Sequence, residues 1–161
     1  ADEKGILLGS FEPDDRILIV YNDGNYMITD QEMTQRFDAD KILLIEKFDG
    51  EKIISAIYLD KKNLQYNVKR FKIETTTLKN KFFFIKEGDG NYVEAVSTDA
   101  EPILAVQSGR GDQVRKAKFK IVKVSEVMGW RTVGTKLLDY SKSVQMEWVR
   151  SKQSDNQPEL F

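Results

Sequence analysis

The side chains in this sequence that could do chemistry are mostly cationic, and they are concentrated in one stretch. The 33 residues from Arg110 to Lys142 hold nine lysines and arginines against three acidic residues. A row of such cations can neutralise the phosphates of a nucleic acid and release its counterions, and these contacts position a duplex without reading its bases. The nine are Arg110, Arg115, Lys116, Lys118, Lys120, Lys123, Arg131, Lys136 and Lys142.

A second basic group comes earlier in the sequence. It consists of Lys69, Arg70 and Lys72, with Lys61, Lys62, Lys79 and Lys81 nearby. Residues 1–60 hold 14 acidic and 6 basic side chains, whereas residues 61–150 hold 10 acidic and 18 basic ones. The net charge of −1 therefore conceals a strong polarity, and the basic half predicts a polyanionic partner. The alternative is an uneven distribution of ordinary solvated charges.

The residue types that are absent exclude the common catalytic and metal-binding chemistries. The chain has no cysteine and no histidine, which excludes disulfides, thiolate metal sites, serine–histidine triads and the usual general base at neutral pH. A carboxylate enzyme such as a glycosidase stays open, because Asp14-Asp15 and the pair Asp38 and Asp40 exist. Those pairs lie in turn-like segments with no sign of a pocket, so we predict no catalytic residue, no metal and no cofactor.

The elements that must position the cations are predicted to be strands joined by tight turns. Runs rich in β-branched and aromatic residues recur at 17–21, 26–29, 41–48, 53–59, 66–73, 81–86, 92–96, 103–107 and 114–124. Turn residues such as Asp23-Gly24 and Asp49-Gly50 separate them. In the last run apolar residues alternate with basic ones, which predicts one packed face and one basic face. Residues 30–37 could form one short helical turn. Phe82-Phe83-Phe84 and Phe119 are predicted core residues.

Three segments of the sequence share one plan: an apolar strand, a polar turn and a second strand that becomes basic. They begin at residues 17, 54 and 103, with offsets of 37 residues from Tyr21 to Tyr58 and 49 residues from Ile54 to Ile103. Four-stranded propeller-type blades repeat at about this length, so the sequence predicts an all-β fold of about three blades. Because the period is irregular, a plain β-sandwich is the alternative.

Three motifs occur in a characteristic order. Asp15-Arg-Ile-Leu-Ile-Val-Tyr-Asn-Asp-Gly24 opens a repeat, Tyr66-Asn-Val-Lys-Arg-Phe71 follows, and Val127-Met-Gly-Trp-Arg-Thr-Val-Gly134 precedes Thr135-Lys-Leu-Leu138. In this order they resemble the C-terminal domains of the A subunits of bacterial type II DNA topoisomerases, DNA gyrase and topoisomerase IV, over roughly residues 15–149. The resemblance is closest to topoisomerase IV of the Bacteroidetes type. It implies a β-pinwheel, a propeller relative whose blades exchange strands and hold DNA along a basic outer rim.

Departures from the family pattern refine these expectations. The nearest match to the Q-R-G-G-K-G box of gyrase is Gln107-Ser-Gly-Arg-Gly-Asp112, which loses much of the positive charge and favours topoisomerase IV over gyrase. The M-G-R element carries an inserted tryptophan, Trp130, which we predict to fill the space between blades. Family rings often have five or six blades and about three fit here, so a partial or open ring is expected.

The resemblance also implies a function. The chain would capture duplex DNA and present it for the ATP-dependent strand passage that changes DNA topology. ATP, Mg and the cleavage tyrosine would belong to the remainder of the A subunit and to the B subunit, so the fragment alone is no enzyme. The predicted DNA-binding residues are Lys69, Arg70, Lys72, Arg110, Arg115, Lys116, Lys118, Lys120, Lys123, Arg131 and Lys136. The alternative is a protein-interaction β-propeller whose basic half binds an acidic partner.

We predict one domain over residues 1–149 and a disordered tail over 150–161. The tail ends Gln157-Pro-Glu-Leu-Phe161, which resembles the Q-x-x-L-F peptide by which bacterial proteins dock on the sliding clamp; Gln157, Leu160 and Phe161 would make the contacts. No stretch approaches the roughly 18 apolar residues of a membrane span, and residues 1–4 do not resemble a signal peptide. A cytoplasmic, nucleoid-associated location without membrane contact is expected.

Overall fold

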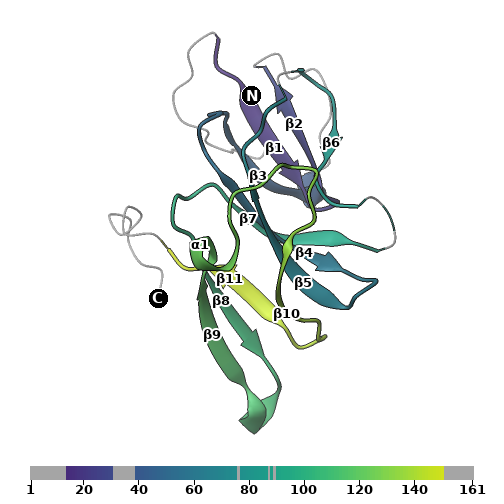
Figure 1. Cartoon of the computed structure of the whole chain (residues 1–161), viewed down its shortest axis with the longest axis vertical. Coiled ribbons are helices and arrows are strands. Elements are labelled where there is room, and N and C mark those ends of the chain that lie inside the picture. Colours follow the sequence, from purple (N-terminus) through teal and green to yellow (C-terminus); the bar gives the residue numbers. More distant parts are fainter. Residues whose placement is uncertain (1–13, 31–38, 76, 87, 89, 151–161) are drawn as a thin grey trace.

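A computed structural model describes residues 14–30, 39–75, 77–86, 88 and 90–150 (Figure 1). Within these residues the regular secondary structure is almost entirely antiparallel β-strand. The strands are β1 (Ile17–Tyr21), β2 (Asn25–Thr29), β3 (Ile42–Lys47), β4 (Ile54–Asp60), β5 (Gln65–Phe71), β6 (Phe82–Phe83), β7 (Tyr92–Ser97), β8 (Ile103–Ser108), β9 (Arg115–Lys120), β10 (Thr135–Asp139) and β11 (Gln145–Trp148). The helical pieces are the 3-10 turns η1 (Ala39–Lys41) and η2 (Gly111–Gln113) and the single turn α1 (Ile121–Val124).

Each of the three predicted repeats folds into a hairpin, namely β1–β2, β4–β5 and β8–β9. A later strand pairs with the first strand of each hairpin: β3 with β1, β7 with β4 and β11 with β8. The second strand of a hairpin receives its partner from the following repeat, because β6 pairs with β2 and β10 pairs with β5. The repeats therefore exchange strands, as expected for a pinwheel.

The result is three sheets, which we call A (β3-β1-β2-β6), B (β10-β5-β4-β7) and C (β11-β8-β9). Sheets A and B have four strands, whereas sheet C has three. In the described part of the chain, no strand lies beside β9 in the position that β6 takes beside β2 and β10 takes beside β5. The arrangement is thus an open one, with the outer edge of β9 unpaired.

Sheet B lies between the other two sheets; in Figure 1, sheet A is at the top and sheet C is at the bottom. One face of sheet B, with Ile54 and Phe71, packs against Leu18 of sheet A. The opposite face, with Ile57 and Val68, packs into a second core with residues of sheet C. Because side chains alternate along a strand, β4 and β5 are buried along almost their whole length.

An aromatic cluster joins sheets A and B. The ring of Tyr26 stacks on that of Phe82 with a centroid distance of 5.5 Å, and Phe71 lies 5.1 Å from Phe84. The indole of Trp130 meets Tyr26 edge-on at 6.1 Å. Such pairs contribute about 0.5–1.5 kcal/mol each beyond their buried area. Trp130 comes from the crossover between α1 and β10, so the prediction that it fills the space between blades is confirmed.

The predicted core positions are only partly buried. Phe84 is fully buried, whereas Phe82, Phe83 and Phe119 are half-buried. The predicted strand 81–86 shortens to β6, because Phe84 leaves the ladder and donates its N–H to the carbonyl of Gly24 at 2.8 Å.

The prediction of one strand over residues 114–124 is wrong in its second half. β9 ends at Lys120, and the next four residues form α1 with Ile121 fully buried. The N–H of Ile121 donates to the carbonyl of Pro102 at 3.1 Å, which turns the chain back over the start of β8. β10 and β11 are absent from the predicted strands, because both are short and mix charged with apolar residues.

Some predictions fall outside the described residues. These are the helical turn, of which 31–37 are not described, and the tail over 151–161 with its clamp-like residues Gln157, Leu160 and Phe161. Within the described residues, no helix has the length and apolar character that crossing a membrane requires. The same residues contain no group of three or more carboxylates that could hold a metal ion.

Candidate nucleic-acid interface

The exposed basic side chains are concentrated on β9, the unpaired edge strand of sheet C. Arg115, Lys116, Lys118 and Lys120 are all exposed along it. The three lysines are two residues apart and therefore point to the same face of the strand, with about 7 Å between successive side chains. The opposite residues of β8 on that face carry no charge. β9 thus presents a regular row of cations.

The other face of β9 anchors this row to the domain. Phe119 packs against the core that sheets B and C share, together with Leu104 and Val106 of β8. Phe119 stands opposite Leu104, and Ala117 stands opposite Val106. The predicted alternation is therefore correct from Lys116 to Lys120: the three lysines share one face, and the exposed Ala117 and the half-buried Phe119 share the other.

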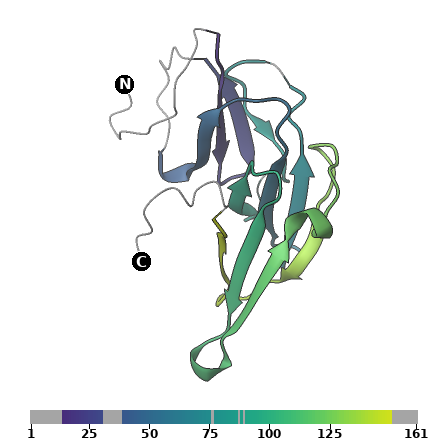
Figure 2. The ribbon, with the colours of Figure 1, turned by 90° about the vertical axis from the view of Figure 1, so that its left-hand side faces the viewer.

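A glycine turn at the tip of the β8–β9 hairpin continues the basic surface. Gly109 has a φ of +90°, and a Cβ atom there would lie 2.2 Å from the carbonyl oxygen of Gln113, so only glycine fits. The N–H of Gly109 donates to Oγ of Ser143 at 2.9 Å, which ties the tip to the turn before β11. Arg110 is exposed beside it. The hairpin projects from the lower end of the molecule (Figure 2).

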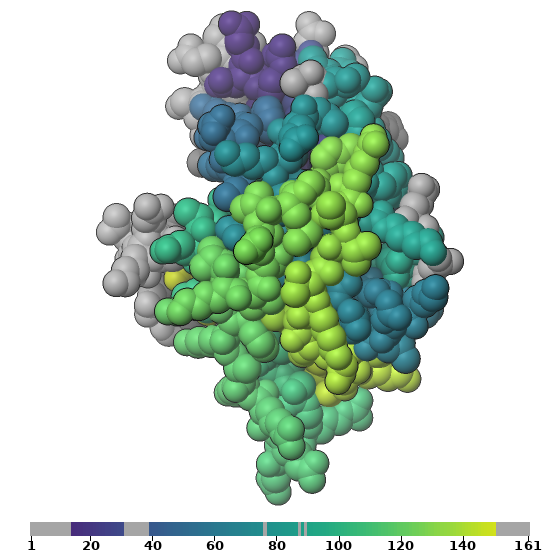
Figure 3. Space-filling view, viewed as in Figure 1, coloured from purple at the N-terminus to yellow at the C-terminus, as the bar shows by residue number. Residues whose placement is uncertain are grey.

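The cations of this region make no ion pairs within the described residues. We call Arg110, Arg115, Lys116, Lys118, Lys120 and Lys123 the β9 cluster; none of the six makes an ion pair with another described residue. Figure 3 shows this green segment at the lower end of the molecule. No internal ion pair must therefore break before the cluster meets an external anion.

Lys69 and Arg70 differ from this pattern, because they are buried. Their exposed fractions are 2% and 6%. β5, which carries both residues, is packed on both faces and paired on both edges, with β4 and with β10. The expectation that these two cations share an exposed rim with the others is wrong.

The two buried cations instead hold the crossover segments that exchange strands. Nζ of Lys69 donates to the carbonyl of Phe84, between β6 and β7. Nη1 of Arg70 donates to the carbonyl of Ser125, between α1 and β10, at 3.2 Å, and its Nε donates to Oγ of Ser55 at 3.3 Å. Burial lowers the pKa of Lys69 to about 8 and also lowers the pKa of Arg70. Both side chains therefore act as internal ties.

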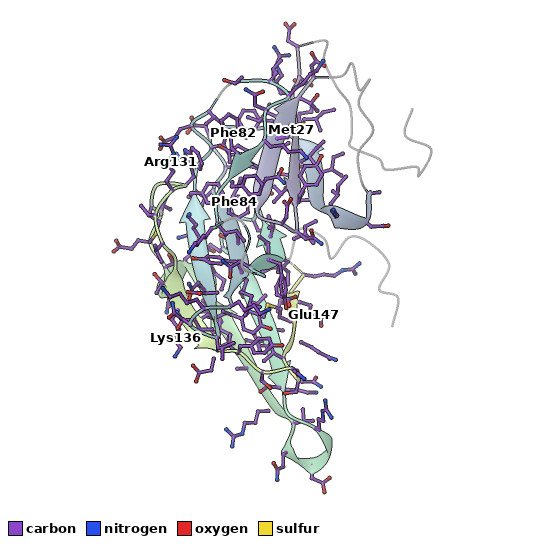
Figure 4. The ribbon with its side chains drawn as sticks, turned by 90° about the vertical axis from the view of Figure 1, so that its right-hand side faces the viewer. Met27, Phe82, Phe84, Arg131, Lys136 and Glu147 are labelled. Carbon is purple, nitrogen blue, oxygen red and sulfur yellow. The ribbon has the colours of Figure 1, made fainter. Side chains whose placement is uncertain are left out.

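The remaining predicted residues lie apart from the β9 cluster. Lys72 follows β5 and pairs with Glu51 at 3.5 Å, and Lys136 of β10 pairs with Asp139 at 2.7 Å. The guanidinium of Arg131 lies 4.7 Å from the ring centre of Trp130. Figure 4 shows Arg131 near Phe82 in the upper half and Lys136 lower down. The predicted set thus divides into the buried pair, the β9 cluster and these three peripheral cations.

Comparisons with known proteins agree with this architecture. Residues 1–147 match the family model described as topoisomerase C-terminal domain, Bacteroidota. No curated protein matches the chain. Among solved structures, the crystal structure of the C-terminal domain of DNA topoisomerase IV is similar, with a TM-score of 0.62 and 17% identity over 88% of this chain. The match covers 49% of that structure, and it identifies the fold as an open β-pinwheel. The chain belongs to the family of Bacteroidota topoisomerase C-terminal domains.

Proposed function

We propose that this domain binds duplex DNA without sequence specificity through the β9 cluster, as part of a topoisomerase IV A subunit. The observation that carries the proposal is the unpaired edge strand with four exposed cations on it. Family membership supports the choice of DNA as the polyanion, because topoisomerases act on DNA. Contacts of this kind are made to phosphates, which carry no base information.

The expected contribution to binding is electrostatic. The logarithm of the binding constant falls linearly with the logarithm of salt concentration. Each phosphate that a lysine or arginine neutralises makes this slope steeper by about 0.9. The β9 cluster would therefore give a slope of about −3.6 to −4.5 if four or five of its members bind phosphates at once. Affinity should depend steeply on salt and little on sequence.

In the parent enzyme the domain would capture and present a DNA segment while other parts do the chemistry. The remainder of the A subunit and the B subunit would supply DNA cleavage, ATP hydrolysis and Mg, so this domain needs no cofactor and no catalytic residue. Such an enzyme works in the cytoplasm at the nucleoid. The hairpin tip carries only Arg110 as a cation from residues 107 to 112, which favours holding DNA over wrapping it and supports topoisomerase IV over gyrase.

Contact with the sliding clamp through Gln157, Leu160 and Phe161 is a separate proposal. It rests on the five-residue sequence alone. A peptide with the tail sequence should bind the clamp, and a peptide with Leu160 and Phe161 replaced by alanine should not. Absence of binding by the unchanged peptide contradicts the proposal.

Substitution of the edge strand tests DNA binding. In one variant Arg115, Lys116, Lys118 and Lys120 become glutamine. In a matched control Lys41, Lys47, Lys52 and Lys79, which lie in or beside sheet A with exposed or half-exposed side chains, become glutamine. Two duplexes of unrelated sequence are titrated by fluorescence anisotropy at about 0.1 M salt. The edge-strand variant should lose at least about 100-fold in affinity, and the control less than about tenfold.

Equal losses in both variants would contradict the proposal, because net charge alone would then explain binding. A protein-interaction module with an acidic partner predicts a different result for the unmodified chain. In that case the unmodified chain should bind plain duplex DNA weakly, and its affinity should not depend steeply on salt concentration.

A further inference from the structure

A second group of cations surrounds a cleft between sheets A and B, away from the β9 cluster. The cleft has a volume of about 680 Å³. Its walls are residues 82–86, the turn at 60–63 and the crossover residues 130–133, and Tyr58 and Lys69 of sheet B line it from within. Figure 4 shows Arg131, Phe82 and Phe84 gathered in the upper half of the molecule, far from the hairpin at the lower end. This cleft is therefore separate from the proposed duplex-binding strand.

The lining of the cleft is strongly cationic. Among the described residues that line the cleft, the charged ones are Lys62, Lys69, Lys81, Lys86 and Arg131, with one carboxylate, that of Asp60. Both carboxylate oxygens of Asp60 accept hydrogen bonds from Asn63: Oδ1 from the backbone N–H at 3.2 Å and Oδ2 from Nδ2 at 2.8 Å. The Asp60 carboxylate is thus hydrogen-bonded within its own turn, and the described lining residues carry more positive than negative charge.

Lys69 is the most unusual member of the lining. Its ammonium group carries three N–H donors, and the carbonyl of Phe84 accepts one of them. Within the described residues no carboxylate pairs with it. A buried ammonium group without a counter-charge costs several kcal/mol of desolvation. An anion in the cleft would offset this cost.

Hydrogen bonds hold the walls of the cleft in place. Asn91 accepts the N–H of Lys61 at 2.9 Å and donates to the carbonyl of Lys86 at 3.3 Å, which joins two of the walls. The N–H of Gly134 donates to Oη of Tyr58 at 2.9 Å. A Cβ at Gly134 would lie 2.5 Å from the carbonyl oxygen of Val68, so the crossover approaches β5 as closely as only glycine permits. A preformed site loses less entropy when it binds a ligand.

We infer that this cleft binds a phosphate group, with the ammonium group of Lys69 at its base and the guanidinium of Arg131 at its rim. A phosphate offers several anionic oxygens to donors that converge from different walls, and a planar guanidinium suits its geometry. The phosphate has two sources with the same chemistry: the backbone of bound DNA or a free phosphate compound. The inference does not depend on the β9 cluster.

Titration with inorganic phosphate tests the inference. Calorimetry on the whole chain is carried out at constant ionic strength with chloride as the competing anion. Lys69→Met, which replaces the ammonium group but keeps an unbranched apolar side chain one atom shorter, should weaken phosphate binding by at least about tenfold. Arg131→Gln should weaken it by about threefold or more. Lys142→Gln, an exposed control outside the cleft, should leave it unchanged. Lys69→Met removes a buried charge and is expected to fold.

Three results would overturn the inference. Phosphate gives no binding heat beyond that of chloride, Lys69→Met binds phosphate as the unmodified chain does, or Lys142→Gln weakens binding as much as Arg131→Gln. If phosphate binds, a short DNA duplex is added to the complex. Displacement of phosphate by the duplex identifies the DNA backbone as the ligand of the cleft, whereas simultaneous binding of duplex and phosphate identifies a free phosphate compound as the ligand. The edge-strand variant with four glutamines should keep its phosphate site, so failure of one proposal is distinguishable from failure of the other.

Discussion

β5 and β9 occupy the same place in successive repeats and carry nearly the same sequence pattern. Each is the second strand of its hairpin, and each carries a basic pair after a valine, in Val68-Lys-Arg-Phe71 and in Val114-Arg-Lys-Ala117. In the pairing with the first strands, Lys69 stands opposite Ala56 and Lys118 stands opposite Ala105. The structure nevertheless gives their cations opposite environments. Lys69 and Arg70 are buried and donate to carbonyl groups, whereas Arg115 and Lys116 are exposed.

The number of neighbouring strands explains the difference. β5 has β4 on one edge and β10 on the other, and sheets A and C cover its two faces. Within the described part of the chain, β9 has β8 beside it and no strand on its other edge, and it lies at the end of the stack of sheets. When the next repeat supplies a strand beside its edge, a basic strand is therefore buried and its cations hold crossover segments by hydrogen bonds. When its edge stays unpaired, its cations form an accessible surface.

Removal of the Arg70 side chain should produce the largest difference between the two strands. Arg70→Leu leaves the carbonyl of Ser125 without its donor and loosens the crossover to β10, so we expect the free energy of unfolding to fall by about 3 kcal/mol. Arg115→Leu on β9 should change it by less than about 0.5 kcal/mol. Urea denaturation measures both. Similar losses in the two variants would show that burial does not distinguish the strands.

The pH dependence of stability should also distinguish the strands, through Lys69. Its pKa is about 8 in the folded chain against an ordinary value of 10.5, so the unfolded chain binds more protons between these values. The free energy of unfolding should therefore rise with pH, by about 2 kcal/mol from pH 8 to 10. Denaturation of the unmodified chain and of Lys69→Met across this range measures the effect.

The difference between the two proteins isolates Lys69 from the tyrosines. Burial raises the pKa of Tyr26 and of Tyr66, which opposes the trend above about pH 10 in both proteins. A matched variant on β9, Lys118→Met, should keep the full pH dependence. If Lys69→Met keeps it too, Lys69 is not the group responsible.

Local sequence pattern was sufficient for much of the fold. The apolar strands and the polar turns between them predict all three hairpins, because these depend on neighbours in the chain. The exchange of strands and the place of Trp130 followed from the family resemblance. β10 and β11 were missed, since Thr135–Asp139 and Gln145–Trp148 are recognisable as strands only beside β5 and β8.

The candidate site was predictable in composition but not in exposure. The cations of β9 are exposed as the alternation predicts. The burial of Lys69 and Arg70 depends on contacts with Phe84 and Ser125, which are 15 and 55 residues away in sequence. One local signal did exist: Val68 and Phe71 flank the two cations and lie on opposite faces of the strand, so both faces of β5 carry apolar side chains. On β9, by contrast, one face carries Lys116, Lys118 and Lys120 in succession.

The salt dependence of duplex binding tests the central claim, that β9 and not β5 is the basic strand available to DNA. The slope of the logarithm of the binding constant against the logarithm of salt concentration is measured for the unmodified chain, for Lys118→Gln and for Arg70→Leu, well below the unfolding midpoint of each. We predict that Lys118→Gln makes the slope shallower by about 0.9 and that Arg70→Leu leaves it unchanged. An unchanged slope for Lys118→Gln together with a shallower slope for Arg70→Leu would contradict the account.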